Sequence, residues 1–159
     1  MQVQSEQKRV LLEKWLERTL ATYPSQTLRF LQGEKDRFRN PVGHTLKEGL
    51  ATLLDELTGE MDSAKIGPAL ESIVRLRAVQ DFTPSQAVGF VYLLREILQD
   101  ESAGGEPSDV QRRIDELALR AFDLFMKCRE EIYEIKAREA QRKVYVLERL
   151  RQRAQGEDL

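Results

Sequence analysis

The sequence predicts an all-α protein, a globin-like bundle of five to six helices that ends in one long C-terminal helix. Apolar residues recur at intervals of three and four along most of the chain, and no segment shows sustained alternation of apolar and polar residues. Residues 108–154 contain neither Gly nor Pro. At about 1.5 Å per residue they form a rod of roughly 70 Å, longer than a domain of this size is wide. The rod must meet another chain or stand in solvent.

Composition restricts the class of protein. The 159 residues suit one domain, spanning 1–159, and 41% of them are apolar, enough for a core. The formal net charge of −2 gives no reason to expect nucleic acid or anionic lipid as a partner. No apolar run approaches the ~18 residues of a transmembrane segment. The N-terminus is polar and Cys128 is the sole cysteine, so we expect a cytoplasmic protein without disulfides.

Helix boundaries follow from proline, glycine and capping residues. Pro24 ends a first helix over residues 5–21, because the residue before proline is disfavoured in the helical region. Asn40 is a favourable N-cap for a third helix that continues to about residue 58. Gly43 and Gly49 lie inside that helix, and close approach of another helix or of a ligand would explain them. The other predicted segments are a short helix over 26–32, a connection over 59–67, helices over 68–79 and 84–99, and a flexible loop over 100–107.

The long helix carries two apolar stripes. From residue 114 to 135 the stripe is wide, which suits packing into a core and against a partner; from Tyr133 the apolar positions shift to a thinner second stripe that resembles a coiled-coil seam. Residues 136–159 are therefore expected to form a projecting helical tail. Its basic residues are interspersed with Glu and are interpreted as a solvated surface, with nucleic-acid or membrane contact as the alternative. The expected homodimer interface comprises Ile114, Leu117, Ala121, Phe125, Ile132, Ala140, Val144 and Leu147.

Residues for metal binding and catalysis are scarce. The chain has one histidine and one cysteine, no recognisable catalytic or nucleotide-binding motif, and no convergent pair of carboxylates. We therefore expect no enzyme activity, no metal and no cofactor. Cys128 falls in an apolar stripe and is interpreted as a packing residue, with a redox switch as the alternative. His44 is interpreted as a structural or surface residue, with metal or haem ligation as the alternative.

Several motifs together resemble one protein family. They are residues 36–43 (Asp-Arg-Phe-Arg-Asn-Pro-Val-Gly), 53–57 (Leu-Leu-Asp-Glu-Leu), 77–87 (Arg-Ala-Val-Gln-Asp-Phe-Thr-Pro-Ser-Gln-Ala) and 128–134 (Cys-Arg-Glu-Glu-Ile-Tyr-Glu). From about residue 11 to 146 the chain resembles the N-terminal sensory domain of RsbR-type co-antagonists, the stressosome proteins of bacterial stress signalling. The resemblance implies a globin-like fold without haem, a dimer joined through terminal helices, and a sensory or docking role upstream of an output domain. The chain ends at Leu159, so we expect either a free-standing sensor or adaptor or a domain that has been adopted for another complex.

Two polar-aromatic corners precede helices and are the candidate binding sites for a ligand or partner protein. Free backbone N–H groups at helix starts can hold an anion or a partner carboxylate. The alternative is that these corners define the fold: Asn40 caps, Phe38 and Phe82 fill the core, and Arg37 pairs with Asp81 or another acid. The candidates are Arg37, Phe38, Asn40 and His44 at the first corner, and Gln80, Asp81 and Phe82 at the second.

Taken together, the sequence predicts a non-catalytic, dimeric sensor or adaptor domain in bacterial stress or redox signalling. One alternative is an accessory structural subunit of a larger complex, for example a respiratory one. Another is a globin-like domain that binds a small ligand. The partner protein and the signal are not predicted.

Overall fold

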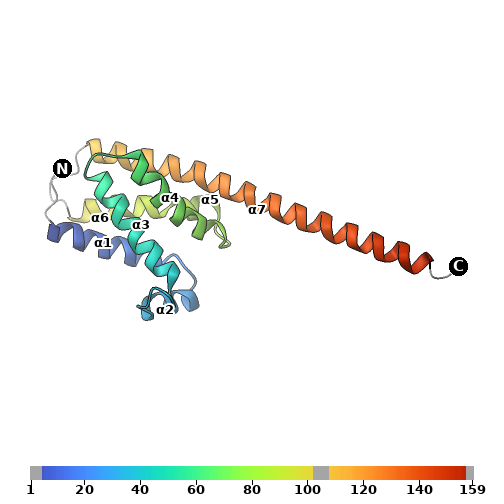
Figure 1. Cartoon of the computed structure of the whole chain (residues 1–159). Coiled ribbons are helices and arrows are strands. Elements are labelled where there is room, and N and C mark those ends of the chain that lie inside the picture. Colours follow the sequence, from blue (N-terminus) through green and yellow to red (C-terminus); the bar gives the residue numbers. More distant parts are fainter. Residues whose placement is uncertain (1–4, 102–107, 157–159) are drawn as a thin grey trace. The chain divides into compact units, whose positions relative to one another are not determined.

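The computed structural model describes residues 5–101 and 108–156, and within them the protein is helical without strands. This confirms the all-α class, with seven helices in place of the five or six predicted (Figure 1). The chain divides into two compact units, Met1–Phe125 and Met126–Leu159. The helices are α1 (Ser5–Leu20), α2 (Ser25–Gly33), α3 (Pro41–Leu57), α4 (Ser63–Ala78), α5 (Pro84–Val88), α6 (Phe90–Glu101) and α7 (Ser108–Gly156).

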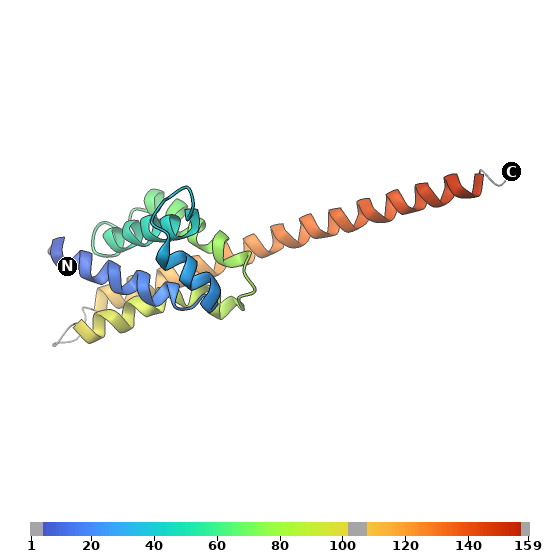
Figure 2. The same cartoon turned by 90° about the horizontal axis from the view of Figure 1, so that it is seen from below.

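The first unit is a bundle in which α3 packs along α4, while α1 packs against both α3 and α6 (Figures 1 and 2). Its core includes Trp15 and Phe90, both fully buried, and the Trp15 indole N–H donates to the Phe90 carbonyl oxygen at 2.7 Å. Gly49 lets α4 approach α3 closely, because a Cβ there would lie 2.8 Å from side-chain carbons of Ile73. The predicted close approach of a helix at Gly49 is thereby confirmed.

Two predicted helix starts are confirmed in their capping chemistry. The Asn40 side chain accepts a hydrogen bond from the Gly43 N–H at 2.8 Å, and Pro41 is the first residue of α3. Thr83 forms a capping box at α5: its hydroxyl accepts from the Gln86 N–H, and the Gln86 side chain accepts from the Thr83 N–H. Each arrangement satisfies backbone donors that a helix start leaves without an intrahelical partner.

Two predicted boundaries are wrong. Helix α4 begins at Ser63, five residues before the predicted start, because the Asp62 carboxylate caps it by accepting from the Ala64 N–H at 2.9 Å. Pro68 therefore lies inside the helix. The predicted helix over 84–99 is two helices, because at Gly89 the bonding changes: its carbonyl accepts from the Tyr92 N–H, three residues on. Of the predicted loop over 100–107, residues 100 and 101 belong to α6, and 102–107 lie outside the described residues.

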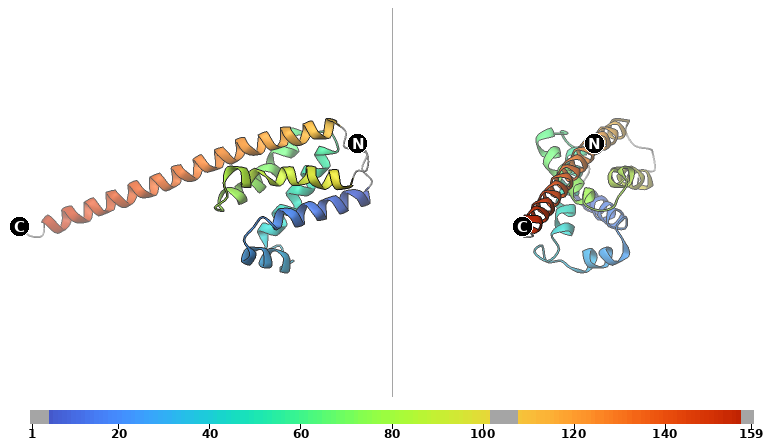
Figure 3. Two further views of the ribbon diagram at one scale, coloured as in Figure 1. Left: turned by 180° about the vertical axis from the view of Figure 1, so that it is seen from behind. Right: turned by 90° about the vertical axis from the view of Figure 1, so that its right-hand side faces the viewer.

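Helix α7 is one continuous helix of 49 residues that ends two residues later than predicted (Figure 3). Within the first unit its core face contributes fully buried side chains to the bundle. Four of the residues predicted for a dimer interface belong to this face, so that part of the prediction is wrong. They are Ile114, Leu117, Ala121 and Phe125, each 0% exposed.

The second unit, Met126–Leu159, is described as helix to residue 156. Ile132 is half-buried, and every described residue from Tyr133 onward is exposed. Ala140, Val144 and Leu147, the remaining predicted interface residues, are therefore on its surface. The prediction that residues 136–159 project as a tail concerns the placement of the two units and stays a prediction.

Candidate functional site

Asn40 organises the first corner. It is 4% exposed, and its amide group donates to the backbone carbonyls of Leu31 and Glu34, both at 2.9 Å. Its side-chain oxygen caps α3 through Gly43. One side chain therefore ties the end of α2, the turn after it and the start of α3 together. Gly43 fits this arrangement because a Cβ there would lie 2.5 Å from the Asn40 amide nitrogen.

The turn before Asn40 presents an aromatic side chain to solvent. Phe38 is 87% exposed, and the guanidinium of Arg37 lies 5.6 Å from its ring centroid. Among the described residues Arg37 has no ion pair, with Asp81 or with any other acid. The expectation that Phe38 fills the core and that Arg37 pairs with Asp81 is therefore wrong. Phe38 and Arg37 are surface groups.

The second corner is built around Arg77, which is fully buried. Its guanidinium donates to the backbone carbonyls of Ala87 and Gln86, each at 2.8 Å, and to the Thr22 hydroxyl at 3.2 Å. It also faces three aromatic rings, and it thereby joins the end of α4 to α5, α6 and the turn after α1. The rings are those of Phe82, Tyr23 and Phe90, at 4.5, 5.3 and 5.5 Å from the guanidinium carbon.

The electrostatics of this cluster are those of a buried cation held by neutral groups. Burial lowers the pKa of Arg77, and burial raises the pKa of Tyr23, whose hydroxyl is buried without a hydrogen-bond partner. Backbone carbonyls and ring faces thus take the place of a counter-ion. Phe82 packs edge-on against Tyr23, with ring centroids 5.4 Å apart, which supports its fold-defining interpretation. Asp81 is exposed and Gln80 is half-buried. No hydrogen bond or ion pair joins the two corners within the described ranges.

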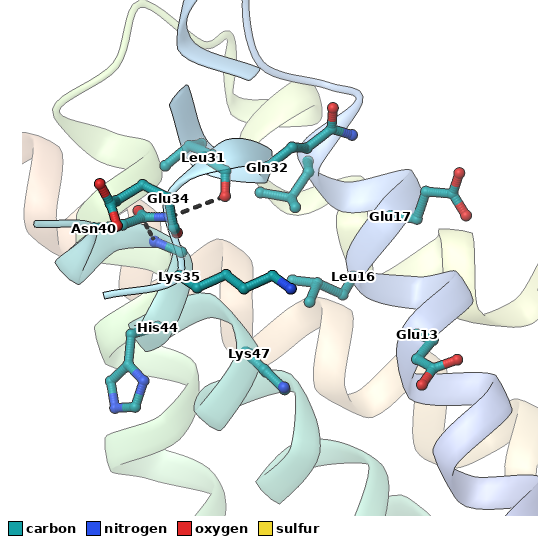
Figure 4. Close-up of a pocket in the computed structure, with 12 residues that line it drawn as sticks. Glu13, Leu16, Glu17, Leu31, Gln32, Glu34, Lys35, Asn40, His44 and Lys47 are labelled. Atoms are coloured by element: carbon teal, nitrogen blue, oxygen red, sulfur yellow. Dashed lines mark hydrogen bonds between the residues drawn. The ribbon is translucent and has the colours of Figure 1, made fainter. Parts of the chain in front are cut away.

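A cavity of about 640 Å³ opens between α1, α2 and α3 (Figure 4). The α1 wall provides Glu13, Leu16, Glu17 and Leu20. The opposite wall comes from the end of α2, the turn after it and the first turns of α3, so the Asn40 corner forms one edge of the cavity. Its residues are Leu31, Gln32, Glu34, Lys35, Asn40, Gly43, His44 and Lys47.

Some charged groups of the cavity have partners and others have none. Glu13 pairs with Arg9 at 3.1 Å, and Glu34 lies 3.9 Å from Arg39. Lys35, Lys47 and Glu17 have no ion pair among the described residues. Another crevice, between α1 and α6, is different because its charges pair across it: Lys14 with Glu101, and Arg18 with Glu96 and Asp100.

His44 and Cys128 are the remaining residues with chemical potential. His44 Nε2 lies 3.0 Å from a carboxylate oxygen of Glu48, one turn later on α3. Cys128 is buried, in accord with its interpretation as a packing residue. Within residues 5–101 and 108–156, no three His, Cys, Asp or Glu side chains converge in a way that could hold a metal ion. In the same ranges no helix has the length and apolarity needed to cross a membrane.

The structure is an all-helical one with an open cavity, an exposed aromatic turn and a long helix whose residues from Tyr133 onward are exposed. Residues 9–140 match the sequence profile of the RsbT co-antagonist protein RsbRD N-terminal domain. The chain belongs to this family, a family of sensor-type domains in stress signalling, and the predicted resemblance is confirmed.

One relative is similar in length to this chain. The chain is 25% identical over 137 residues to an uncharacterised protein of Archaeoglobus fulgidus, and the match covers 83% of each protein. No solved structure matches this chain.

Proposed function

We propose that this chain is a non-catalytic homodimeric sensor or adaptor domain of stress or redox signalling, globin-like without haem and located in the cytoplasm. Membership of the stress-signalling family supports the sensory part. The observation that carries the dimer is the exposed apolar seam of the second unit, which we define as Tyr133, Ala137, Ala140, Val144 and Leu147.

The seam has the spacing of a coiled coil. Its members follow one another at intervals of four, three, four and three residues, so all five lie on one helix face. Tyr133 is 57% exposed and Leu147 is 65% exposed, and together with the three seam residues between them they form an apolar stripe on the surface. Pairing with the same seam of a second copy would remove this surface from water.

The charges beside the seam favour a parallel arrangement of two copies. On one flank lie Arg129, Lys136 and Lys143; on the other lie Glu134, Gln141 and Glu148. In a parallel, in-register pair the basic flank of one helix faces the acidic flank of the other, for example Lys143 against Glu148 of the second copy. An antiparallel pair would place like charges together. The seam and its flanks therefore specify one orientation.

Two valines of similar exposure provide a matched test of the dimer. Val144 lies in the seam and is 55% exposed, whereas Val146 lies outside it and is 53% exposed. Val144→Glu removes one buried side chain per copy, about 1.5 kcal/mol each, so the dimer should dissociate roughly a hundredfold more readily. Val146→Glu should leave the dissociation constant within about twofold, as an exposed substitution does. Sedimentation equilibrium measures both; a monomeric wild type, or equal effects of the two variants, refutes the seam.

Orientation has its own test. In a Cys128→Ser background, Leu147→Cys places a thiol at a seam position that meets its own counterpart only in a parallel, in-register pair. Mild oxidation should convert the protein to a covalent dimer on a non-reducing gel. A dimer that resists this cross-link contradicts the parallel arrangement.

A second candidate function, an accessory subunit of a larger complex, is favoured by Phe38. Aromatic and arginine side chains dominate the binding energy of many interfaces, and Phe38 with Arg37 is such a pair on the surface. In the native host, the tagged wild-type chain should then retain one stoichiometric partner that Phe38→Ala loses. Tyr92→Ala, at another exposed aromatic, is the control. If no partner is retained, the sensor proposal stands alone.

A further inference from the structure

We infer that the cavity between α1, α2 and α3 binds a small organic monocarboxylate with an apolar body. The inference deepens the sensory part of the proposed function, on which it rests, by naming the chemical class of ligand. It follows from the shape of the cavity, its leucine lining and the state of its charged groups.

The cavity can hold a small molecule and offers it an apolar surface. Its volume of about 640 Å³ lies within the range of small-molecule sites. Leu16 and Leu20 of α1 and Leu31 of α2 line it, and the last two are already 7% and 6% exposed, so they are fixed by packing. An aliphatic or aromatic body laid on these leucines would remove further apolar surface from water.

The lysines of the first unit indicate the charge of the ligand. The described part of this unit contains five lysines, at positions 8, 14, 35, 47 and 65. Three are neutralised by carboxylates: Lys8 by Asp55, Lys14 by Glu101 and Lys65 by Glu56. The other two, Lys35 and Lys47, have no such partner, and both line the cavity.

The carboxylates that line the cavity form no ion pair with these two lysines. Glu13 and Glu34 already face arginines, and Glu17 has no ion pair among the described residues. Among the lining groups that have no ion pair within the described ranges, two are lysines and one is a carboxylate. Figure 4 shows the Lys35 side chain extending toward Leu16. A cation and an apolar side chain therefore face the same part of the cavity. A carboxylate with an apolar tail matches this pairing.

Two probes of similar length and opposite charge test the assignment without any mutation. Hexanoate and hexylammonium are both unbranched six-carbon molecules, one with a carboxylate and the other with an ammonium group at its end. Titrated into ¹⁵N-labelled wild-type protein, hexanoate should give saturable shifts at the Lys35 and Gly43 amides. Hexylammonium should bind roughly tenfold more weakly or not at all, since it meets the lysines with like charge. Equal or tighter binding of hexylammonium, or shifts without saturation, overturns the proposal.

Variants assign the effect to named groups. Lys35→Gln and Lys47→Gln should each weaken hexanoate binding by roughly two- to fivefold, the range for partly solvated charge pairs. Lys127→Gln, an exposed lysine of the second unit, should leave it unchanged. Glu17→Gln should strengthen it by removing repulsion; weaker binding of hexanoate to Glu17→Gln contradicts the assigned charge balance. Dimerisation is measured separately at the seam, so loss of the dimer with intact hexanoate binding refutes only that part of the proposed function.

Discussion

Replacement of Arg77 by methionine should destabilise the first unit strongly, although arginine is the most polar group in its core. Methionine is similarly long and unbranched, so it largely fills the space but has no donors. The carbonyls of Ala87 and Gln86, each 2.8 Å from the guanidinium, would lose their hydrogen bonds. Each carbonyl left unsatisfied in a buried place costs about 1–3 kcal/mol.

Two further contributions act in opposite directions. The rings of Tyr23, Phe82 and Phe90 lose a cation, worth about 0.5–2 kcal/mol. Removal of the charge also relieves the desolvation that lowers the pKa of Arg77. A lowered pKa means that folding disfavours the charged form, so at neutral pH the charge itself opposes stability and its neutral partners offset it. We expect a net loss of about 2–4 kcal/mol for Arg77→Met, against total stabilities of about 5–15 kcal/mol.

Urea unfolding followed by the fluorescence of Trp15, the single tryptophan and a fully buried one, measures this loss. Arg75→Met on the same helix is the control: Arg75 is an exposed residue that pairs with Glu71 one turn earlier, and its loss should cost under about 0.5 kcal/mol. The slope against urea should be equal in all variants, so that midpoints compare stabilities. A loss below about 1 kcal/mol for Arg77→Met would show that the hydrogen bonds and rings contribute little net stability.

Three further changes test other packing and charge statements. Asn40→Asp keeps the cap to Gly43 but loses both amide donor bonds in a buried place, and should lower the free energy of unfolding by about 2–3 kcal/mol in the same urea assay. Gly49→Ala should cost about 1–3 kcal/mol, and Ile73→Val in the same chain should recover part of it, which a double-mutant cycle measures. Burial raises the pKa of Tyr23, so the protonated hydroxyl contributes stability below about pH 10, and this stability is lost as the pH rises further. In Tyr23→Phe, the free energy of unfolding should therefore depend less steeply on pH above about pH 10.

Local chemistry explains the parts of the fold that the sequence predicted well. Asn40 followed by Pro41, and Thr83 with Gln86, satisfy helix-start donors within a few residues, so their roles are readable without tertiary structure. The start of α4 at Ser63 was not predicted, because Gly67 and Pro68 are stronger local signals for a helix start than the cap at Asp62. Pro68 lies inside α4, although proline is found most often in the first turn of a helix.

Arg77 illustrates a limit of reasoning from residue type. It follows Ile73 and Val74 at helical spacing, which places it on the buried face of α4. Charged residues are rarely fully buried, so residue type alone favours a surface position for it. The spacing was the available signal. Its acceptors are carbonyls of α5 and a hydroxyl after α1, and their convergence is a tertiary property.

Helix α7 shows the same limit for apolar stripes. Periodicity identified Phe125 and Leu147 as apolar positions of one long helix, and both assignments are right as patterns. Which stripe is buried in its own unit depends on what packs against it, so the predicted interface mixed core and surface residues. The cavity was likewise beyond prediction, because only the structure shows that Lys35 and Lys47 line it without the carboxylate partners that the other three described lysines of the first unit have.

Helix α1 connects the cavity with the Arg77 cluster, and this gives the ligand a route to the core. Leu16 lines the cavity, while the adjacent Trp15 donates to the Phe90 carbonyl, and Thr22, just after the helix, accepts from Arg77. A ligand that favours one position of α1 shifts the population of that position, and the coupling is reciprocal. Saturating hexanoate should therefore change the emission of Trp15, and Arg77→Met should change the hexanoate affinity. If both stay constant while hexanoate binds, the cavity and the cluster are energetically independent, and a signal from the cavity must leave through the Asn40 turn instead.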